Sequence, residues 1–191
     1  KFLAEYQPEK LAAAEWHFET MNNAPLILGG ILTEDNEVKY GIKIPYALSI
    51  LAHGNPTSEV QGLYETPEDE RPSVYIHYLF DLMVTIGIFI TLVAALYLVA
   101  RIRKKGNPHS RILLWAIFIS APLSVFAIEF GWIFAEIGRQ PWILRGYMKT
   151  AQGATTSEHV DTMLLLFGLL YLVLGITVTR VLRKMFHHNP A

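Results

Sequence analysis

Apolar residues fill three long stretches of the chain almost without interruption. They cover residues 75–100, 112–137 and 162–182. A helix needs about 20 apolar residues to cross the roughly 30 Å hydrocarbon layer of a bilayer, and each stretch reaches that length. The pattern therefore predicts three membrane-spanning helices.

The residues before the first span show shorter periodic patterns. Pro8 suits the first turn of a helix, and apolar side chains then recur at spacings of three and four, which predicts an amphipathic helix. This stripe is formed by Leu11, Ala14, Phe18 and Met21. An apolar run at 26–32, a polar turn at 34–37 and an alternating run at 38–44 predict a short β-hairpin. Residues 55–72 are rich in Pro, Glu and Asp, which is typical of a linker or a mobile loop.

Basic residues set the predicted orientation, because the cytoplasmic loops of membrane proteins are enriched in Lys and Arg. The loop 101–111 has five basic residues and no acidic one, and the C-terminal tail is also basic. Residues 1–75 have five basic residues against twelve acidic ones. We therefore expect residues 1–74 and 138–161 to lie outside the cell, with the basic loop and the C-terminus in the cytoplasm.

The predicted fold class is an all-α membrane protein. Three transmembrane helices follow an extracytoplasmic N-terminal segment that holds an amphipathic helix and a short β-hairpin. The expected organisation is an outer segment (1–74), three spans (75–100, 112–137 and 162–182), an inner basic loop (101–111), an outer loop (138–161) and an inner tail (183–191).

Composition supports a membrane protein and narrows its chemistry. Hydrophobic residues make up 52% of the chain and charged residues 17%, against about 25% charged residues in a typical soluble domain. The 16 basic and 17 acidic residues nearly cancel, which gives no support for a nucleic-acid partner. Because there is no cysteine, any redox metal must be held by His, Met, Glu or Asp. The chain begins at Lys1 without a signal peptide, so we expect it to be a portion of a longer protein.

The second span carries a polar stripe near its outer end. Glu129, Trp132, Glu136 and Arg139 are spaced three, four and three apart, so they share one helix face. A charged residue at the centre of a span costs about 2.5–3.5 kcal/mol on insertion scales, which indicates a polar neighbour. In the alternative interpretation, Glu136 and Arg139 form an ion pair at the interface and Trp132 belongs to the aromatic belt. That alternative does not explain Glu129, which lies about 10 Å deeper than Glu136.

The first span and the external helix carry weaker signals. His77 and Asp81 are four residues apart on one helix face, which favours a His–Asp pair at the level of the lipid headgroups. Met83 follows; an intramembrane Met is more often a packing residue, although a thioether can also bind low-spin haem iron. Lys10 and Glu15 are five residues apart, and taken alone both are typical of solvated charges.

Several of these residues belong to motifs that resemble a known family. Residues 138–142 (Gly-Arg-Gln-Pro-Trp), preceded by residues 131–132 (Gly-Trp) and by Glu136, resemble the signature of subunit I of the cytochrome bd quinol oxidases. Residues 10–15 (Lys-Leu-Ala-Ala-Ala-Glu) resemble the quinol-binding loop of that family. Residues 80–84 (Phe-Asp-Leu-Met-Val) resemble the stretch that supplies a methionine haem ligand. The three motifs occur in the order of the family and extend over nearly the whole chain.

The resemblance implies metal and substrate ligands. Glu136 matches the glutamate that ligates the iron of the high-spin haem b. Met83 matches the methionine that ligates the iron of the low-spin haem b. Lys10 and Glu15 match the two loop residues implicated in quinol oxidation, where a cation can steady the quinone oxygen and a carboxylate can accept a proton.

The resemblance also implies roles for the rest of the polar stripe. Arg139 matches a cofactor-binding arginine near the haem propionates, since a guanidinium can bind two carboxylate oxygens. Trp132 matches a tryptophan packed among the haems of the oxygen-reducing site. Glu129 matches a further acid, for which we expect a role in the haem environment or in proton delivery, so Glu129 and Trp132 are the candidate catalytic residues. Many relatives have Arg where this chain has Asp81, which leaves the charge around the low-spin haem open.

For the whole protein the resemblance implies a quinol:oxygen oxidoreductase, a multi-pass protein of the prokaryotic cytoplasmic membrane. It would reduce dioxygen to water and generate a proton gradient without pumping, with haem d in the complete subunit. This chain would be part of a larger helical bundle; the expected partners are the remainder of subunit I, subunit II, small single-helix subunits and membrane lipid. The residues alone leave two other classes open: a haem-free membrane anchor with an external binding module, and a transporter fragment in which Glu129 and Glu136 relay protons.

Overall fold

A computed structural model describes residues 1–103 and 109–188 of the chain. Residues 104–108 of the predicted basic loop and residues 189–191 of the predicted tail lie outside the described residues. The chain divides into two compact units, residues 1–153 and 154–191. Each unit is described by itself.

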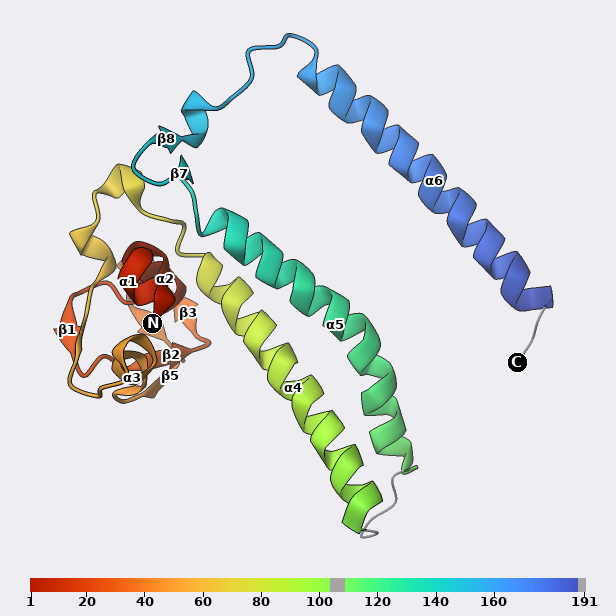
Figure 1. The fold of residues 1–191 in the computed structure, drawn as a ribbon, viewed down its shortest axis with the longest axis horizontal. Coiled ribbons are helices and arrows are strands. Elements are labelled where there is room, and N and C mark those ends of the chain that lie inside the picture. The colour runs from red at the N-terminus through yellow and green to blue at the C-terminus, as the bar shows by residue number, and fades with distance from the viewer. Residues whose placement is uncertain (104–108, 189–191) are drawn as a thin grey trace. The chain divides into compact units, whose positions relative to one another are not determined.

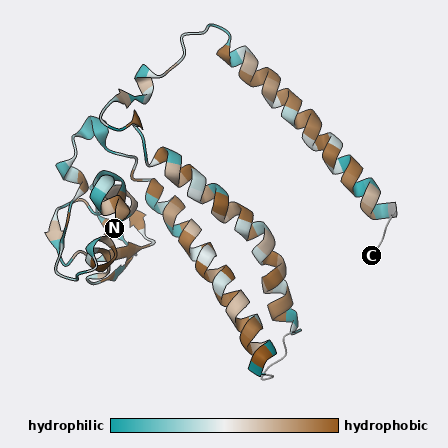
Figure 2. Ribbon diagram, viewed as in Figure 1, coloured by the Kyte–Doolittle hydropathy of each residue, from teal (hydrophilic) through white to brown (hydrophobic). Residues whose placement is uncertain are grey.

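Three long helices confirm the predicted spans. They are α4 (Ile76–Arg103), α5 (Arg111–Ile137) and α6 (Val160–His188). All three are long and apolar enough to cross a membrane, and Figure 2 shows them as mostly hydrophobic along their length. The predicted fold class, mostly helical with three membrane spans and small β-hairpins in the N-terminal part, is therefore correct.

Helices α4 and α5 lie side by side as an antiparallel pair (Figure 1). Ser110 begins α5, because its side-chain oxygen accepts a hydrogen bond from the Leu113 backbone N–H, an arrangement typical of a helix N-cap. Ile86 and Val93 of α4 are buried, whereas most other side chains of the two helices are exposed. Exposed apolar side chains suit a helix that is surrounded by lipid or by further helices.

The N-terminal segment contains three short helices, α1 (Phe2–Tyr6), α2 (Pro8–Ala14) and α3 (Ala47–His53). Pro8 occupies the start of α2, as predicted. The amphipathic stripe, however, extends less far than predicted: α2 ends at Ala14, so Phe18 and Met21 are not helical. The backbone of Trp16 has a left-handed φ of 47°, which ends a right-handed helix.

Short antiparallel strands confirm the predicted hairpin. Strand β2 (Leu26–Leu28) pairs with β5 (Ile42–Ile44), and β3 (Ile31–Leu32) pairs with β4 (Val38–Lys39).

The prediction of a linker at 55–72 is wrong. This stretch forms β6 (Glu59–Val60), which pairs with β1 (Met21–Asn22), and two short 3₁₀ helices, η1 (Leu63–Glu65) and η2 (Glu68–Glu70). Val60 and Leu63 are buried, so apolar anchors fix the stretch in spite of its Pro and Glu content.

Residues 138–153 form a second small structure after α5. Strand β7 (Trp142–Leu144) pairs with β8 (Met148–Lys149), and the 3₁₀ helix η3 (Thr150–Gln152) follows.

Two small apolar clusters hold the N-terminal segment together. One places the alanines of α2 against Leu63, against Ile76 at the start of α4 and against Phe134 near the end of α5. The other joins Ala24, Leu48 and Val60 with their neighbours. The first cluster is the one that positions the candidate site, because it seats α2 on the ends of the two long helices.

Candidate functional site

Lys10 lies with its charged end against helix α5. Its side chain is only 7% exposed, and Nζ donates a hydrogen bond to the Ala135 carbonyl oxygen over 3.0 Å. The ammonium also lies 4.8 Å from the ring centroid of Phe134. A cation is favourable at this place, since the last carbonyl groups of a helix carry partial negative charge.

Burial has a measurable electrostatic consequence for Lys10. Desolvation lowers the pKa of the ammonium, the positive charge of Arg139 lowers it further, and Glu136 acts in the opposite direction. The side chain of Lys10 is thus in electrostatic contact with both ends of the Glu136–Arg139 pair.

Gly138 allows this contact through close packing. A side-chain Cβ at position 138 would come within 2.7 Å of Lys10 Cε and within 2.7 Å of the Phe134 carbonyl oxygen. The first residue of the Gly-Arg-Gln-Pro-Trp motif therefore leaves the space in which the Lys10 side chain crosses the end of α5.

Glu15 is buried at the C-terminal end of α2. Its side chain is 3% exposed, and desolvation raises the pKa of its carboxyl group from 4.5 to about 8. The charge of His77 and the Ile27 backbone N–H lower this pKa, while the charge of Asp81 raises it. A carboxyl group with a pKa near 8 can take up and release a proton close to neutral pH.

The predicted His77–Asp81 pair is present at the start of α4. His77 Nε2 lies 3.3 Å from Asp81 Oδ2, and the imidazole is completely buried. Nδ1 lies 2.6 Å from the Ala14 carbonyl oxygen. Asp81 also accepts a hydrogen bond from the Gly29 backbone N–H, so this acid is fixed from both the helix and the external hairpin.

Three hydrogen bonds fasten the segment around Glu15. Trp16 Nε1 donates to the Val74 carbonyl oxygen over 2.8 Å, and His17 Nε2 lies 3.1 Å from the Val60 carbonyl oxygen. The His77–Ala14 contact is the third. The Trp16 ring also stacks on the His77 ring with 3.7 Å between centroids.

The interpretation of Lys10 and Glu15 as solvated charges is wrong. Both lie among the few buried charged residues of the described chain, because α2 packs between η1 and the long helices. They do not form one cluster: Lys10 contacts α5, whereas Glu15 interacts with α4 and β2.

Met83 lies where α4 meets α5. A Cβ at Gly131 would come within 2.8 Å of Met83 Sδ, so the missing side chain of Gly131 leaves room for the thioether.

The polar stripe of α5 lies on a different side of that helix. At about 100° per residue, Glu129 and Glu136 are roughly opposite Gly131, and both are exposed. Trp132 is 62% exposed. Glu136 and Arg139 form the predicted ion pair, with 3.8 Å between Oε2 and NH1. Glu129 has no hydrogen bond or ion pair within residues 1–103 and 109–188.

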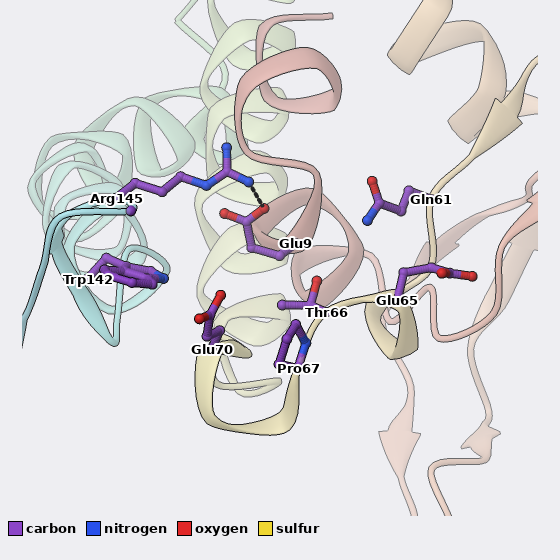
Figure 3. Close-up of a pocket in the computed structure, with 9 residues that line it drawn as sticks. Glu9, Gln61, Glu65, Thr66, Pro67, Glu70, Trp142 and Arg145 are labelled. Carbon is purple, nitrogen blue, oxygen red and sulfur yellow. Dashed lines mark hydrogen bonds and ion pairs between the residues drawn. The ribbon is translucent and has the colours of Figure 1, made fainter.

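A surface pocket of about 280 Å³ lies beside the Gly-Arg-Gln-Pro-Trp motif. Figure 3 shows Arg145 pointing at Glu9, with Trp142 and Glu70 below them; Arg145 NH2 is 2.7 Å from Glu9 Oε2. Neither Lys10 nor Glu15 lines this pocket. Arg145 could not be recognised from sequence, because a lone Arg in a polar loop gives no signal of a partner 136 residues earlier in the chain.

The arrangement can support two kinds of chemistry. The Glu15 region can exchange a proton and bind a polar group at the end of the α4–α5 pair. The Met83 thioether and the exposed carboxylate of Glu136 are donor types that bind iron, while no group of three or more His, Asp or Glu side chains gathers as a metal site among the described residues.

Comparison with known proteins gives consistent matches. The sequence model of the family described as cytochrome bd terminal oxidase subunit I matches residues 1–190. The putative cytochrome bd menaquinol oxidase subunit I of Bacillus subtilis is 43% identical over 192 residues, which cover 100% of this chain and 43% of that protein. The cytochrome bd ubiquinol oxidase subunit 1 of the same organism is 33% identical over 190 residues, or 91% of this chain and 40% of that protein.

A solved structure matches the fold as well. The bd oxidase from Geobacillus thermodenitrificans has a chain with a TM-score of 0.87 and 63% sequence identity, covering 99% of this chain and 44% of that one. The present chain thus spans less than half the length of each of these relatives.

Proposed function

The chain belongs to the cytochrome bd terminal oxidase subunit I family, and we propose that it forms the part of a quinol oxidase in which the quinol loop rests on two haem-binding helices. The whole enzyme would oxidise two quinols and reduce one dioxygen to two waters. The observation that carries this proposal is the hydrogen bond from Lys10 Nζ to the Ala135 carbonyl oxygen, next to Glu136. It joins the proposed substrate loop directly to a proposed haem-binding helix.

Glu15 is the proposed proton acceptor for quinol. Because burial raises the pKa of its carboxyl group to about 8, the ionised form takes up a proton readily near neutral pH. Glu15 would take a proton from the quinol hydroxyl, and the electrons of the quinol would be taken up by the haem that Met83 would hold.

Lys10 contributes to the quinol site in a different way from Glu15. Its ammonium is already bound to a carbonyl oxygen of α5 and lies over Phe134. Lys10 therefore holds the loop on α5 and supplies a positive charge beside the bound quinol.

The residues of α5 fit a haem. Glu129, Trp132 and Glu136 form an exposed face on a helix whose other residues are mostly apolar, and within lipid such polar groups need a partner. A haem has a partner for each of these side chains: its flat apolar ring for the Trp132 indole, its iron for the Glu136 carboxylate and its acidic propionates for the Arg139 guanidinium.

The resemblance to the family assigns each proposed haem contact, and the chemistry of the donor atoms is compatible with it. The Glu136 carboxylate would ligate the iron of a high-spin haem b, and the Met83 thioether would ligate the iron of a low-spin haem b. Arg139 would bind propionates, and Trp132 would pack against a ring face. When bound, the haems supply one-electron redox chemistry at iron.

Glu129 lies about 10 Å deeper than Glu136 along the same face. We assign it to the haem environment or to the delivery of protons for water formation. Haem d, further haem ligands, subunit II and any single-helix subunits would be contributed by the rest of the complex.

In the proposed orientation, protons would be released on one side of the membrane and consumed from the other, which generates a proton gradient. The chain is a multi-pass membrane protein, and its basic loop 101–111 would face the cytoplasm. Glu15 would then release quinol protons outside, while the protons consumed in water formation would come from the cytoplasm. Charge separation follows without a proton pump.

The decisive experiment is a reduced-minus-oxidised absorption spectrum of the intact protein that contains this chain, together with a quinol oxidation assay. We expect b-type and chlorin-type bands and oxygen consumption that depends on quinol. A purified protein without those bands would instead favour a membrane anchor or a transporter.

A further inference from the structure

His77 is completely buried, yet it interacts with two acidic groups, Asp81 and Glu15. It lies at the first turn of α4, with the Trp16 ring stacked on one face. Tyr78 lies edge-on to both rings, with centroids 5.0 Å from Trp16 and 6.0 Å from His77. A buried polar ring normally finds a partner for each nitrogen. Here Nδ1 makes a hydrogen bond, whereas Nε2 makes none among the described residues and has only the nearby Asp81 carboxylate to compensate it.

Both nitrogens of His77 face oxygen atoms that can accept hydrogen bonds. Nδ1 is 2.6 Å from the Ala14 carbonyl oxygen, and Nε2 is 3.3 Å from Asp81 Oδ2. A neutral imidazole has only one N–H, so one nitrogen lone pair would then point at an oxygen lone pair. The doubly protonated imidazolium avoids this repulsion, donates to Ala14 and attracts Asp81.

The surroundings keep this charge in place. Asp81 accepts a hydrogen bond from the Gly29 N–H, which holds its carboxylate beside the imidazole ring. The other ionisable group that interacts with His77 is Glu15, whose carboxyl group also accepts a hydrogen bond from the Ile27 backbone N–H. Glu15 therefore has the imidazolium and Asp81 on the α4 side and a backbone donor on the β2 side.

We propose that His77 is held as a permanent imidazolium whose positive charge lets the buried Glu15 ionise, so that His77 sets the pH at which Glu15 can take a proton from quinol. His77 is thus a positioning residue that acts through Glu15 and does not accept the proton itself. This inference rests on the proposed function, in which Glu15 is the proton acceptor.

The proton balance of the step is simple. A quinol O–H bond breaks and its proton bonds to a Glu15 carboxylate oxygen, while one electron would pass to the haem that Met83 would hold, which leaves a semiquinone. The second proton and electron would leave in the same way and give the quinone. Glu15 then loses each proton to external water, and His77 keeps both of its protons throughout. The same burial that isolates Glu15 from water makes a neighbouring charge effective, because the effective dielectric constant there is low.

The test uses the intact oxidase and two variants of His77. His77→Phe keeps a flat ring against Trp16 but removes the charge, and His77→Gln keeps an N–H donor for Ala14 without the charge. The infrared C=O band of protonated Glu15, assigned by its loss in Glu15→Gln, gives the midpoint of Glu15 titration. His53→Phe is the matched control, because His53 is exposed at the end of α3.

In both His77 variants we expect the midpoint to rise by about one pH unit or more, as on removal of a nearby opposite charge. The acid limb of quinol oxidation should move upward in pH by the same amount, and His53→Phe should leave both unchanged. A midpoint that stays in place or falls would overturn the inference.

Two further results keep this inference distinct from the proposed function. If neither variant assembles, ¹⁵N spectra of histidine-labelled wild type decide: a buried ring protonated on both nitrogens at pH 7 supports the inference, and a neutral ring overturns it. If Glu15→Gln retains full quinol oxidation, the proposed role of Glu15 is wrong, while the infrared shift still reports whether His77 controls its ionisation.

Discussion

Two sets of charged groups differ in their exposure. One set lies on α2 and directly after it, and the other lies on the polar stripe of α5. Lys10 and Glu15 are buried, and each has its partners inside this chain. Glu129 and Glu136 lie on a span-forming helix and are exposed, and Glu136 forms an ion pair with Arg139. The first region is complete within the described residues, whereas the second presents its polar groups outward.

This difference separates the work of the two regions. A buried charge with fixed neighbours has a tuned proton affinity, which suits a group that exchanges protons. An acidic residue facing outward from a span costs about 2.5–3.5 kcal/mol at the bilayer centre unless a partner compensates. The α5 face therefore needs a partner from outside residues 1–153, and haem is the partner that we propose.

Removing the carboxylate of Glu136 should give the largest effect. In Glu136→Ala we expect the high-spin haem b signal to disappear from the reduced-minus-oxidised spectrum, and oxygen reduction with it, while the low-spin signal survives. Ile112→Ala, a change at an exposed apolar position at the other end of the same helix, should leave both signals intact. Persistence of both signals in Glu136→Ala would show that this carboxylate is not a haem ligand.

Glu15→Gln should leave the haems in place but prevent proton transfer from quinol to residue 15. We expect quinol oxidation to fall by about 100-fold or more, the usual contribution of a general base, with an unchanged haem spectrum. The exposed Glu19 provides the control Glu19→Gln, which should retain wild-type activity.

The pH dependence gives a second readout of Glu15. Burial raises its pKa to about 8, so the carboxyl group is mostly neutral below that pH and mostly ionised above it. Wild-type quinol oxidation should therefore rise with pH up to about 8 and level off above it, and this limb should vanish in Glu15→Gln. A wild-type rate that is flat between pH 6 and 9 would contradict the assignment.

Lys10→Met should have a smaller and mixed effect, because Lys10 contacts α5. Loss of a cation at a helix C-terminus costs about 1 kcal/mol, so the melting temperature should fall and quinol oxidation should drop by roughly tenfold. The high-spin haem band should also shift, since Lys10 interacts electrostatically with Glu136. Lys39→Met, at an exposed position of β4, should change none of these, and a Lys10→Met band identical to wild type would argue against coupling to α5.

Gly131→Ala should have the mildest effect. The added methyl group would meet Met83 Sδ at 2.8 Å, and overpacking of this kind costs about 1–3 kcal/mol. We expect the low-spin haem band to shift while the high-spin band stays. Gly87→Ala on α4, where a Cβ meets nothing within 4 Å, is the control; equal spectra for the two variants would remove Met83 from the low-spin site.

The sequence was sufficient for features that depend on local pattern. Length and hydropathy predicted the three spans, Pro8 marked the start of α2, and alternation located the hairpin around residues 34–37. The spacing of His77 and Asp81 predicted their pair, because four residues bring two side chains to one helix face.

Features that depend on distant contacts were not predictable. The end of α2 at Trp16 requires a left-handed residue, which costs about 1–2 kcal/mol outside glycine, and the stack on His77 compensates for it from 61 residues away. The burial of Lys10 likewise depends on the Ala135 carbonyl and on space above Gly138. No local pattern in the first 15 residues contains that information.

The Lys10–Ala135 hydrogen bond joins positions 125 residues apart, and this separation has a consequence for biogenesis. The ribosome makes α2 long before α5, and contacts between distant positions form only after the intervening chain is available. The external segment can therefore reach its final position only after α5, the second helix of the α4–α5 pair, has been inserted. The contact of α2 with α5 therefore forms only after α4 and α5 have both inserted into the bilayer, and the proposed quinol site is completed at that point.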